Sequence, residues 1–215
     1  MLKTIILLII LLSCLFNLSA QEESNIKLKI ETGTLWDWVE GKIFISGPFL
    51  NLEPKLKTSK NTFIGLRVGF ALNTQKILAS DSRQFFTNNN SDNNGIISLV
   101  PTFDYYFIKN NFRPYFGLGI GYYFLTTSKK GFVVGAASNV LELSVKNQIG
   151  FLLRGGFNLH KLEIGRFDLS KFIIGLEFNF IPKADVEIPN EQLIGTIDNS
   201  YIGLSIGYAI GLGKT

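Results

Sequence analysis

Apolar and polar residues alternate strictly along several stretches of the chain. From position 62 to 72, every second residue is uncharged, and most are bulky: Thr62, Ile64, Leu66, Val68, Phe70 and Leu72. Most of the residues between them are small or charged: Phe63, Gly65, Arg67, Gly69 and Ala71. Successive side chains of a β-strand point to opposite faces, so this period of two indicates a strand with two unlike faces.

Eight stretches with this character predict eight strands. They are residues 26–36, 43–57, 62–73, 95–108, 112–126, 145–160, 171–181 and 199–212. Most are longer than an ordinary soluble strand and match the ~9–11 residues that a tilted strand needs to cross a bilayer. After the N-terminal segment, no apolar run approaches the ~20 residues of a membrane helix. We therefore expect any membrane spanning to be done by strands.

The connections between these strands alternate between short and long. Residues 58–61 and 109–111 predict tight polar turns, whereas residues 75–94, 127–144 and 182–198 predict long loops, with a polar loop tip at 88–95. Short periplasmic turns and longer extracellular loops are typical of outer-membrane barrels. Residues 161–170 depart from this pattern, because a short turn is expected there. Strands that extend beyond the membrane would account for the extra length.

In each predicted strand, alternate residues form two rows, one on each face. The composition of these two rows decides which face points outward. In residues 112–126, bulky Phe116, Leu118 and Ile120 alternate with Gly117 and Gly119. A soluble barrel with its bulky face inside would show the same alternation. However, an eight-stranded barrel has an interior only just wide enough for side chains, and eight bulky rows would overfill it. We therefore expect the bulky rows to face lipid and the glycine rows to face the lumen.

The charged residues support this orientation. With the bulky rows outward, the inward rows collect a predicted ionic network of Lys29, Glu31, Glu53, Lys55, Arg67, Asp104, Arg113, Arg154 and Glu177. A Lys or Arg facing lipid at the bilayer midplane costs ~2–4 kcal/mol, and the outward rows carry none in their central parts. The bases and acids nearly balance, which predicts a lumen closed by paired charges. Buried charges need such partners or trapped water.

Aromatic residues near the strand ends predict interfacial girdles. Tyr105, Phe107, Phe112 and Phe172 would form one rim, and Phe70, Phe124, Phe178 and Phe180 the other. Ordinary strand aromatics would give the same pattern. Pro101 lies inside a predicted strand and cannot donate a ladder hydrogen bond, so a bulge or local break is expected there.

Residues 1–20 have the pattern of a secretory signal peptide, with Lys3 followed by a short apolar core and small residues before Gln21. Residues 21–215 are then one barrel domain. Cys14 lies in a loose lipobox, so lipidation is an alternative. Cleavage after Ala20 would leave no cysteine, which excludes disulfides and thiol catalysis. The net charge of +4 falls to +3 without Lys3, and the scattered charges argue against nucleic-acid binding.

With these features, the chain resembles the small outer-membrane β-barrels typified by the OmpA transmembrane domain, especially those common in Bacteroidetes. The segment RPYFGLGIGYY at 113–123 is similar to the RPYxGxGxGYxF strand of these proteins. In the last strand, Ser205, Gly207, Ile210 and Leu212 match the signal read by the barrel-assembly machinery. The final three residues replace the aromatic end of that signal and weaken it. The resemblance implies an exported, monomeric protein whose partners are outer-membrane lipid and this machinery.

No residue pattern predicts catalysis, a cofactor or a metal site. The glycines of residues 117–121 continue an alternating strand and do not open a helix, unlike a dinucleotide-binding motif. His160 has neither a second His or Cys for metal binding nor an adjacent serine for lipid hydrolysis. We therefore expect a non-enzymatic protein.

The leading functional hypothesis is a closed barrel whose loops serve envelope structure, adhesion or contact with an extracellular or envelope protein. The alternative is a narrow porin-like channel for ions or small solutes. Less favoured are a secretion accessory, an outer-membrane lipid hydrolase and a soluble ligand-binding barrel in the periplasm. Fold analogy cannot choose among these functions.

Overall fold

The computed structural model describes residues 25–39, 42–73, 78–79, 94–107, 112–127, 130–132, 140–142, 144–159, 163–164, 167–168, 171–188 and 192–212. The predicted signal peptide, Cys14, His160 and most of the polar tract at 88–95 lie outside these residues. Within these ranges, no helix is long and apolar enough to cross a membrane.

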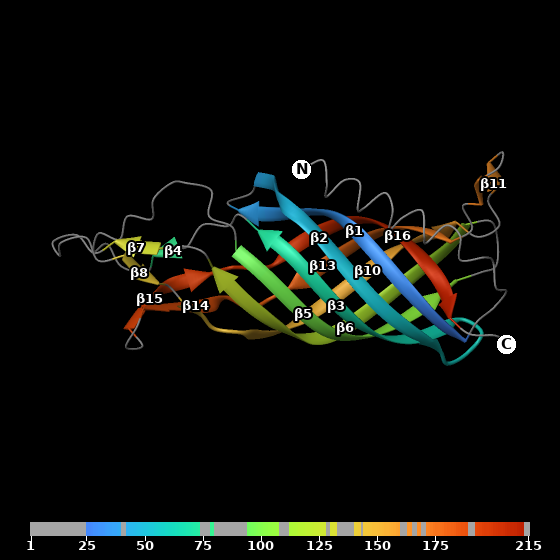
Figure 1. Cartoon of the computed structure of the whole chain (residues 1–215), viewed down its shortest axis with the longest axis horizontal. Coiled ribbons are helices and arrows are strands. Elements are labelled where there is room, and N and C mark those ends of the chain that lie inside the picture. Colours follow the sequence, from blue (N-terminus) through green and yellow to red (C-terminus); the bar gives the residue numbers. More distant parts are fainter. Residues whose placement is uncertain are drawn as a thin grey trace.

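Eight long strands form one closed antiparallel barrel (Figure 1). They are β1 (Ile26–Val39), β2 (Lys42–Lys57), β3 (Thr62–Asn73), β5 (Asn94–Tyr106), β6 (Phe112–Thr127), β10 (Gln148–Leu159), β13 (Phe172–Phe180) and β16 (Tyr201–Leu212). Each strand pairs with the next along the chain, and β16 closes the barrel against β1. This confirms the predicted all-β, eight-stranded, up-and-down barrel.

The barrel strands lie close to their predicted positions, with one clear difference. The stretch 145–160 is not a single strand, because Ser144–Val145 form β9 and pair with β14 (Ala184–Ile188) outside the barrel. The barrel strand β10 begins only at Gln148. The alternation continues across the interruption, and so the pattern alone does not reveal it.

Pro101 produces no bulge. β5 pairs with β3 in one register, with Pro101 opposite Leu66. On the other side, the β5–β6 ladder has partners up to Leu99 and again from Thr102, in the same register. The predicted irregularity is therefore confined to the ladder on one side, and the strand continues through the proline.

The long connections carry strands of their own at one end of the barrel, here called the loop end. The β14–β15 hairpin, with β15 at Gln192–Ile197, lies between β4 (Leu78–Ala79) and β9 in a four-stranded sheet. A second pair joins β7 (Lys130–Phe132) and β8 (Val140–Glu142). These elements extend past the barrel in Figure 1. The predicted loop at 182–198 is thus largely a hairpin.

The opposite end, here called the turn end, contains the tight turn at 58–61 between β2 and β3. It also contains the long connection between β10 and β13. There, β11 (Glu163–Ile164) and β12 (Phe167–Asp168) pair as a small separate hairpin. The extra length predicted for this connection therefore forms its own hairpin and does not lengthen β10 or β13.

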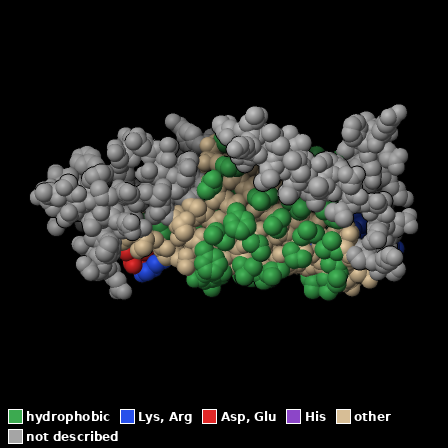
Figure 2. All heavy atoms as spheres, viewed as in Figure 1, with side chains coloured by type: hydrophobic (Ala, Val, Ile, Leu, Met, Phe, Trp, Pro, Cys, Tyr) green, Lys and Arg blue, Asp and Glu red, His purple; other side chains and the backbone are tan. Residues whose placement is uncertain are grey.

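The two faces of the barrel wall differ as the row contents predict. Side chains of the bulky rows are exposed, for example Leu118 at 48% and Ile206 at 60%, whereas inward Arg67 and Glu53 are 0% exposed. Figure 2 shows apolar side chains covering the wall, and the charged side chains visible in that view lie at the two ends. The outer wall is therefore an apolar belt around an interior that contains the buried charges.

Candidate functional site in the barrel lumen

The centre of the lumen holds Arg154 of β10 between two carboxylates from other strands. Its Nη1 and Nη2 donate to the two carboxylate oxygens of Glu53, at 2.7 and 2.5 Å, and its Nε donates to Asp104 Oδ1 at 2.9 Å. Lys55 pairs with Asp104 and lies 3.7 Å from Glu53, and the Thr102 hydroxyl donates to Glu53. These five buried residues are called the Arg154 cluster.

A second ion pair lies on β1, where Lys29 and Glu31 point to the same face. Lys29 Nζ is 2.8 Å from Glu31 Oε1, and it donates to the Tyr115 hydroxyl at 3.2 Å. The ammonium also lies 4.6 Å from the centroid of the Tyr115 ring, close enough for a cation–π interaction. Ser205 donates to the same Glu31 oxygen from β16 at 3.3 Å. This pair connects the closing strand of the barrel to the network.

A third group surrounds Arg67 of β3. Its Nη2 is 2.6 Å from Glu177 Oε1, and the Asn51 and Asn179 amides donate to the same carboxylate at 3.4 and 3.0 Å. The Tyr123 hydroxyl donates to Asn179 Oδ1 at 2.8 Å. These five residues are called the Arg67 cluster. The other guanidinium nitrogens of Arg67, Nε and Nη1, are buried without a hydrogen-bond partner.

Inward glycines make room for these charged groups. A Cβ added at Gly117 would clash with Asp104 Oδ1 and lie 2.9 Å from Arg154 Nε. At Gly65 it would lie 2.8 Å from Glu53 Oε1, and at Gly203 it would lie 2.7 Å from the Glu177 Cγ. Real Cβ atoms do not tolerate such contacts. At these three positions glycine is therefore a steric requirement of the ionic network.

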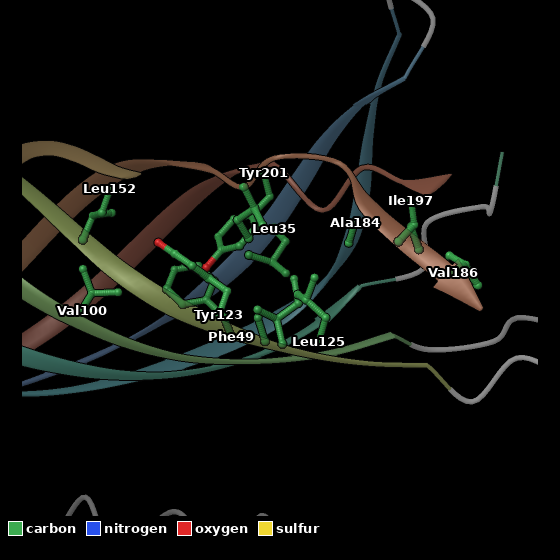
Figure 3. Close-up of a cluster of buried hydrophobic side chains, with 13 residues drawn as sticks. Leu35, Phe49, Val100, Tyr123, Leu125, Leu152, Ala184, Val186, Ile197 and Tyr201 are labelled. Atoms are coloured by element: carbon green, nitrogen blue, oxygen red, sulfur yellow. The ribbon is translucent and has the colours of Figure 1, made fainter. Parts of the chain in front are cut away.

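The loop end of the lumen is filled by apolar side chains, here called the loop-end cap. Residues from the barrel wall and from the β14–β15 hairpin meet in one buried cluster: Leu35, Phe49, Ala71, Ile96, Val100, Tyr123, Leu125, Leu152, Ile181, Ala184, Val186, Ile197 and Tyr201. Figure 3 shows Ala184, Val186 and Ile197 continuing the cluster beyond the barrel residues. The hairpin therefore extends the interior packing past the mouth of the barrel.

The turn end is closed by a smaller layer, here called the turn-end cap. It consists of Phe63, Tyr106, Tyr115 and Ile173, with Ala209 packed against them. The rings of Tyr106 and Tyr115 stack at 5.4 Å between centroids, and Phe63 meets Tyr106 edge-on at 5.2 Å. The ionic network thus lies between two layers of packed apolar and aromatic side chains.

Eight of the nine residues predicted for the network are brought together. Four cations and four carboxylates, each at most 3% exposed, fill the middle of the lumen: Lys29, Lys55, Arg67, Arg154, Glu31, Glu53, Asp104 and Glu177. Arg113 is the exception. It lies half-buried at the turn end and donates to the Lys60 carbonyl at 3.2 Å, without an ion pair among the described residues. Arg113 is the second residue of β6, and it therefore lies near the end of the barrel and away from the centre.

The uncharged partners of this network were not predicted from the sequence, and Ser205 was named only for the assembly signal. Thr102, Asn51, Asn179, Tyr115 and Ser205 all donate or accept hydrogen bonds within it. Each lies on an inward row of the predicted alternation. A search for polar residues on those rows would have found them, although not their partners.

The residues matching the assembly signal all lie on β16, which pairs with β1. Ser205 and Gly207 are buried and face the lumen, Leu212 is exposed, and Ile210 is 5% exposed despite its outward position. Their role in assembly stays a prediction.

Of the aromatics predicted for girdles, six are exposed on the outer wall: Tyr105, Phe107, Phe70, Phe124, Phe178 and Phe180. Phe172 is half-buried and meets Tyr208 edge-on at 5.3 Å. The side chain of Phe112 lies outside the described part. These exposures suit girdles at the two rims of the belt.

Comparison with known proteins identifies the architecture and no family. Neither protein-family profiles nor curated proteins match the sequence. Among solved structures, Neisserial surface protein A has a TM-score of 0.54 at 11% identity, over 88% of this chain and 98% of that one. This chain has the fold of that barrel.

Two further structures give weaker likenesses. Ail, the attachment invasion locus protein of Yersinia pestis, has a TM-score of 0.45 at 12% identity, over 87% of this chain and 99% of that one. The N-terminal β-barrel domain of Pseudomonas aeruginosa OprF has a TM-score of 0.40 at 9% identity, over 87% and 98%.

Proposed function

We propose that the protein is a non-enzymatic integral protein of a bacterial outer membrane, with a closed lumen, whose loop end serves envelope structure, adhesion or contact with another protein. The observation that carries this proposal is the layered interior. Eight paired charges fill the middle, and packed apolar layers lie on both sides of them. An ion crossing such a lumen would have to separate buried charge pairs, which costs several kcal/mol for each charge left alone.

The outer wall supports the membrane assignment. Many large apolar side chains are exposed on it, and in the view of Figure 2 they gather over the barrel strands, whereas soluble monomers rarely expose apolar patches larger than a few hundred Å². The likeness to Neisserial surface protein A supports the barrel architecture. Export by the segment 1–20 and insertion by the barrel-assembly machinery are parts of the same proposal.

Extraction tests whether the barrel is in the membrane. Membranes are washed with carbonate and then with detergent, and the purified protein is run unheated and heated on a gel. We expect the protein to stay in the membranes during the carbonate wash and to be released only by detergent. We also expect the unheated, folded form and the heated form to migrate differently on the gel. Release by salt or carbonate would contradict the membrane assignment.

Planar-bilayer recording tests the closed lumen. We expect purified protein to give no steady openings under conditions in which a general porin conducts. Steady single-channel openings, absent when protein is omitted, would contradict the closed lumen and favour the narrow-channel alternative.

Protease treatment of intact cells tests the orientation. The β14–β15 hairpin lies beyond the barrel wall at the loop end and carries Asp185, whose side chain is 46% exposed. We expect cleavage at the loop end in intact cells and at the turn end only in opened cells. The reverse pattern would contradict a surface role for the loops.

A further inference from the structure

An open groove lies on the outer wall of the barrel, over three neighbouring strands with β10 between β6 and β13. Its volume is about 420 Å³, within the ~300–1,000 Å³ range of small-molecule sites. Its sides are outward apolar side chains, each between 42% and 55% exposed: Leu118, Ile120, Phe151, Leu153, Phe178 and Phe180. These residues define what is here called the wall groove.

The strand register arranges these side chains in two rows that run across the strands. One row is Phe180, Phe151 and Ile120, and the next is Phe178, Leu153 and Leu118. Between the rows lie Gly119 and Leu152, which are cross-strand partners. Leu152 is 2% exposed and packs inside the loop-end cap (Figure 3), and Gly119 has no side chain. The floor of the wall groove is therefore formed by backbone.

The wall groove begins at the loop-end rim of the apolar belt. Phe180 is the last residue of β13, and Phe151 is the fourth residue of β10, which starts from the same end. On the other side, Leu118 is the seventh residue of β6, which starts from the turn end. The groove thus extends from the rim toward the middle of the wall. With the loops outside the cell, it lies in the outer leaflet.

Polar residues lie just beyond this rim. Lys183 is exposed three residues after Phe180, and Asn147 is exposed directly before β10 begins. Lys146 at the same end is ion-paired with Asp185, so the rim carries charges of both signs. A molecule with a polar group at the rim and an apolar chain along the groove would match both surfaces. The groove and its rim together therefore have the polarity expected of a site for an amphiphile.

We propose that the wall groove binds one acyl chain of an outer-leaflet lipid, whose polar group lies at the loop-end rim. The inference rests on the membrane assignment proposed above, because the wall then faces acyl chains. A depression in such a wall either holds a chain or stays a void, and a void forfeits the dispersion contacts of the atoms that line it. A thin, flexible chain can enter the groove, whereas a second barrel would present its own convex wall.

Native mass spectrometry of the detergent-purified protein tests the site. The probe is dimyristoyl phosphatidylcholine, which is titrated into the detergent solution, and bound lipids are counted from the mass of each complex. We expect the first lipid to saturate at a lower concentration than any further lipid. A spread of bound lipids without a preferred first one would contradict the proposal.

Chain length separates the groove from the polar rim. Single-chain phosphocholines of increasing length replace the first probe. We expect the affinity of the first bound molecule to rise with each methylene that enters the groove, because each one leaves water, and to level off once the groove is full. An affinity that does not depend on chain length would place the binding at the rim and contradict the proposal.

Matched variants locate the chain on the wall. Leu153→Trp places a larger ring in the middle of one row and fills the wall groove. Leu52→Trp is the control, because Leu52 is 37% exposed on β2, on the opposite side of the barrel from β10. We expect the affinity for the first lipid to fall at least about tenfold in Leu153→Trp and to stay unchanged in Leu52→Trp. Ile120→Trp is the second groove variant should Leu153→Trp fail to fold, and the same fall is expected.

Equal affinities in the wild type and both variants would overturn the proposal. A dimer mass for the wild type that Leu153→Trp abolishes would also overturn it, and would assign the groove to a second copy of the chain. Carbonate extraction decides the membrane assignment without reference to the groove, so a failure of that assignment is distinguishable from a failure of this proposal.

Discussion

Each of the two arginine clusters of the lumen pairs a buried guanidinium with a carboxylate, but the two guanidinium groups have different numbers of hydrogen bonds. In the Arg154 cluster, the guanidinium donates through Nε, Nη1 and Nη2 to two carboxylates. In the Arg67 cluster, only Nη2 has a partner, and two neutral amides supply the rest of the hydrogen bonding to Glu177. Both arginines are fully buried. An opposite charge alone does not fully stabilise a buried charge, because its remaining donors and acceptors also need hydrogen-bond partners. By this criterion Arg154 is better stabilised than Arg67.

Removing Arg154 is expected to have the largest effect. Arg154→Met leaves Glu53 and Asp104 sharing one lysine in a buried site, and we expect a loss of about 5 kcal/mol or failure to fold. Urea unfolding from lipid vesicles, followed by tryptophan fluorescence, measures the loss. Leu153→Met on the outer wall is the control, with an expected change below about 1 kcal/mol. Equal effects of the two substitutions would contradict the central role of the cluster.

Removing Arg67 is expected to cost less, about 3 kcal/mol. Arg67→Leu leaves Glu177 without a cation, but it also removes two buried donors that lack partners. The double variant Arg67→Leu/Glu177→Gln keeps an acceptor for the amides, and we expect it to recover to within about 1 kcal/mol of the wild type in the same unfolding assay. If the double variant is no more stable than Arg67→Leu, the unpaired Glu177 carboxylate is not the cause of the loss of stability in Arg67→Leu.

Two glycine substitutions test the steric side of the Arg154 cluster. Gly117→Ala places a methyl group against Asp104 and Arg154, and we expect a loss of about 1–3 kcal/mol. Gly155→Ala meets only the Tyr115 carbonyl oxygen at 3.4 Å, an ordinary contact, and we expect it to be neutral or slightly stabilising. The urea midpoints of the two variants are compared in the same lipid. A lower midpoint for Gly155→Ala than for Gly117→Ala would contradict the steric role of Gly117.

An exposed ion pair gives the smallest effect. Lys146 is 56% exposed beside Glu187 at the loop end. We expect Lys146→Gln to change the free energy of unfolding by less than about 0.5 kcal/mol, because water and salt screen the pair. If Lys146→Gln lowers the free energy of unfolding as much as Arg67→Leu does, solvent exposure does not explain the difference between this pair and the buried pair.

Several particular elements could be predicted from the sequence. The row of Thr62, Ile64 and Leu66 identified β3, and the glycine row opposite Phe116 and Leu118 identified the inner face. This was feasible because the period of two is a local property, and the small interior of an eight-stranded barrel excludes the inverted orientation. The same parity placed eight of the nine predicted charges in the lumen.

Other elements could not be predicted because they depend on contacts between distant segments. The hairpin β14–β15 is stabilised by packing of Val186 and Ile197 on the loop-end cap, which its own sequence does not reveal. Val145 continues the alternation of β10 but pairs with Val186 in another sheet. The alternation assigns Arg113 to an inward-facing row, yet Arg113 lies near the end of β6 and does not reach the charges at the centre of the lumen.

The sequence by itself determined the strands, their inward and outward faces and the confinement of charge to the lumen, since these follow from side-chain size and period. Only the tertiary structure decided that Arg154 meets Glu53 and Asp104, that Arg67 meets Glu177, and that a hairpin fills the loop end. The shear of the barrel sets the height of each inward residue, and neighbours across the lumen are far apart in the chain.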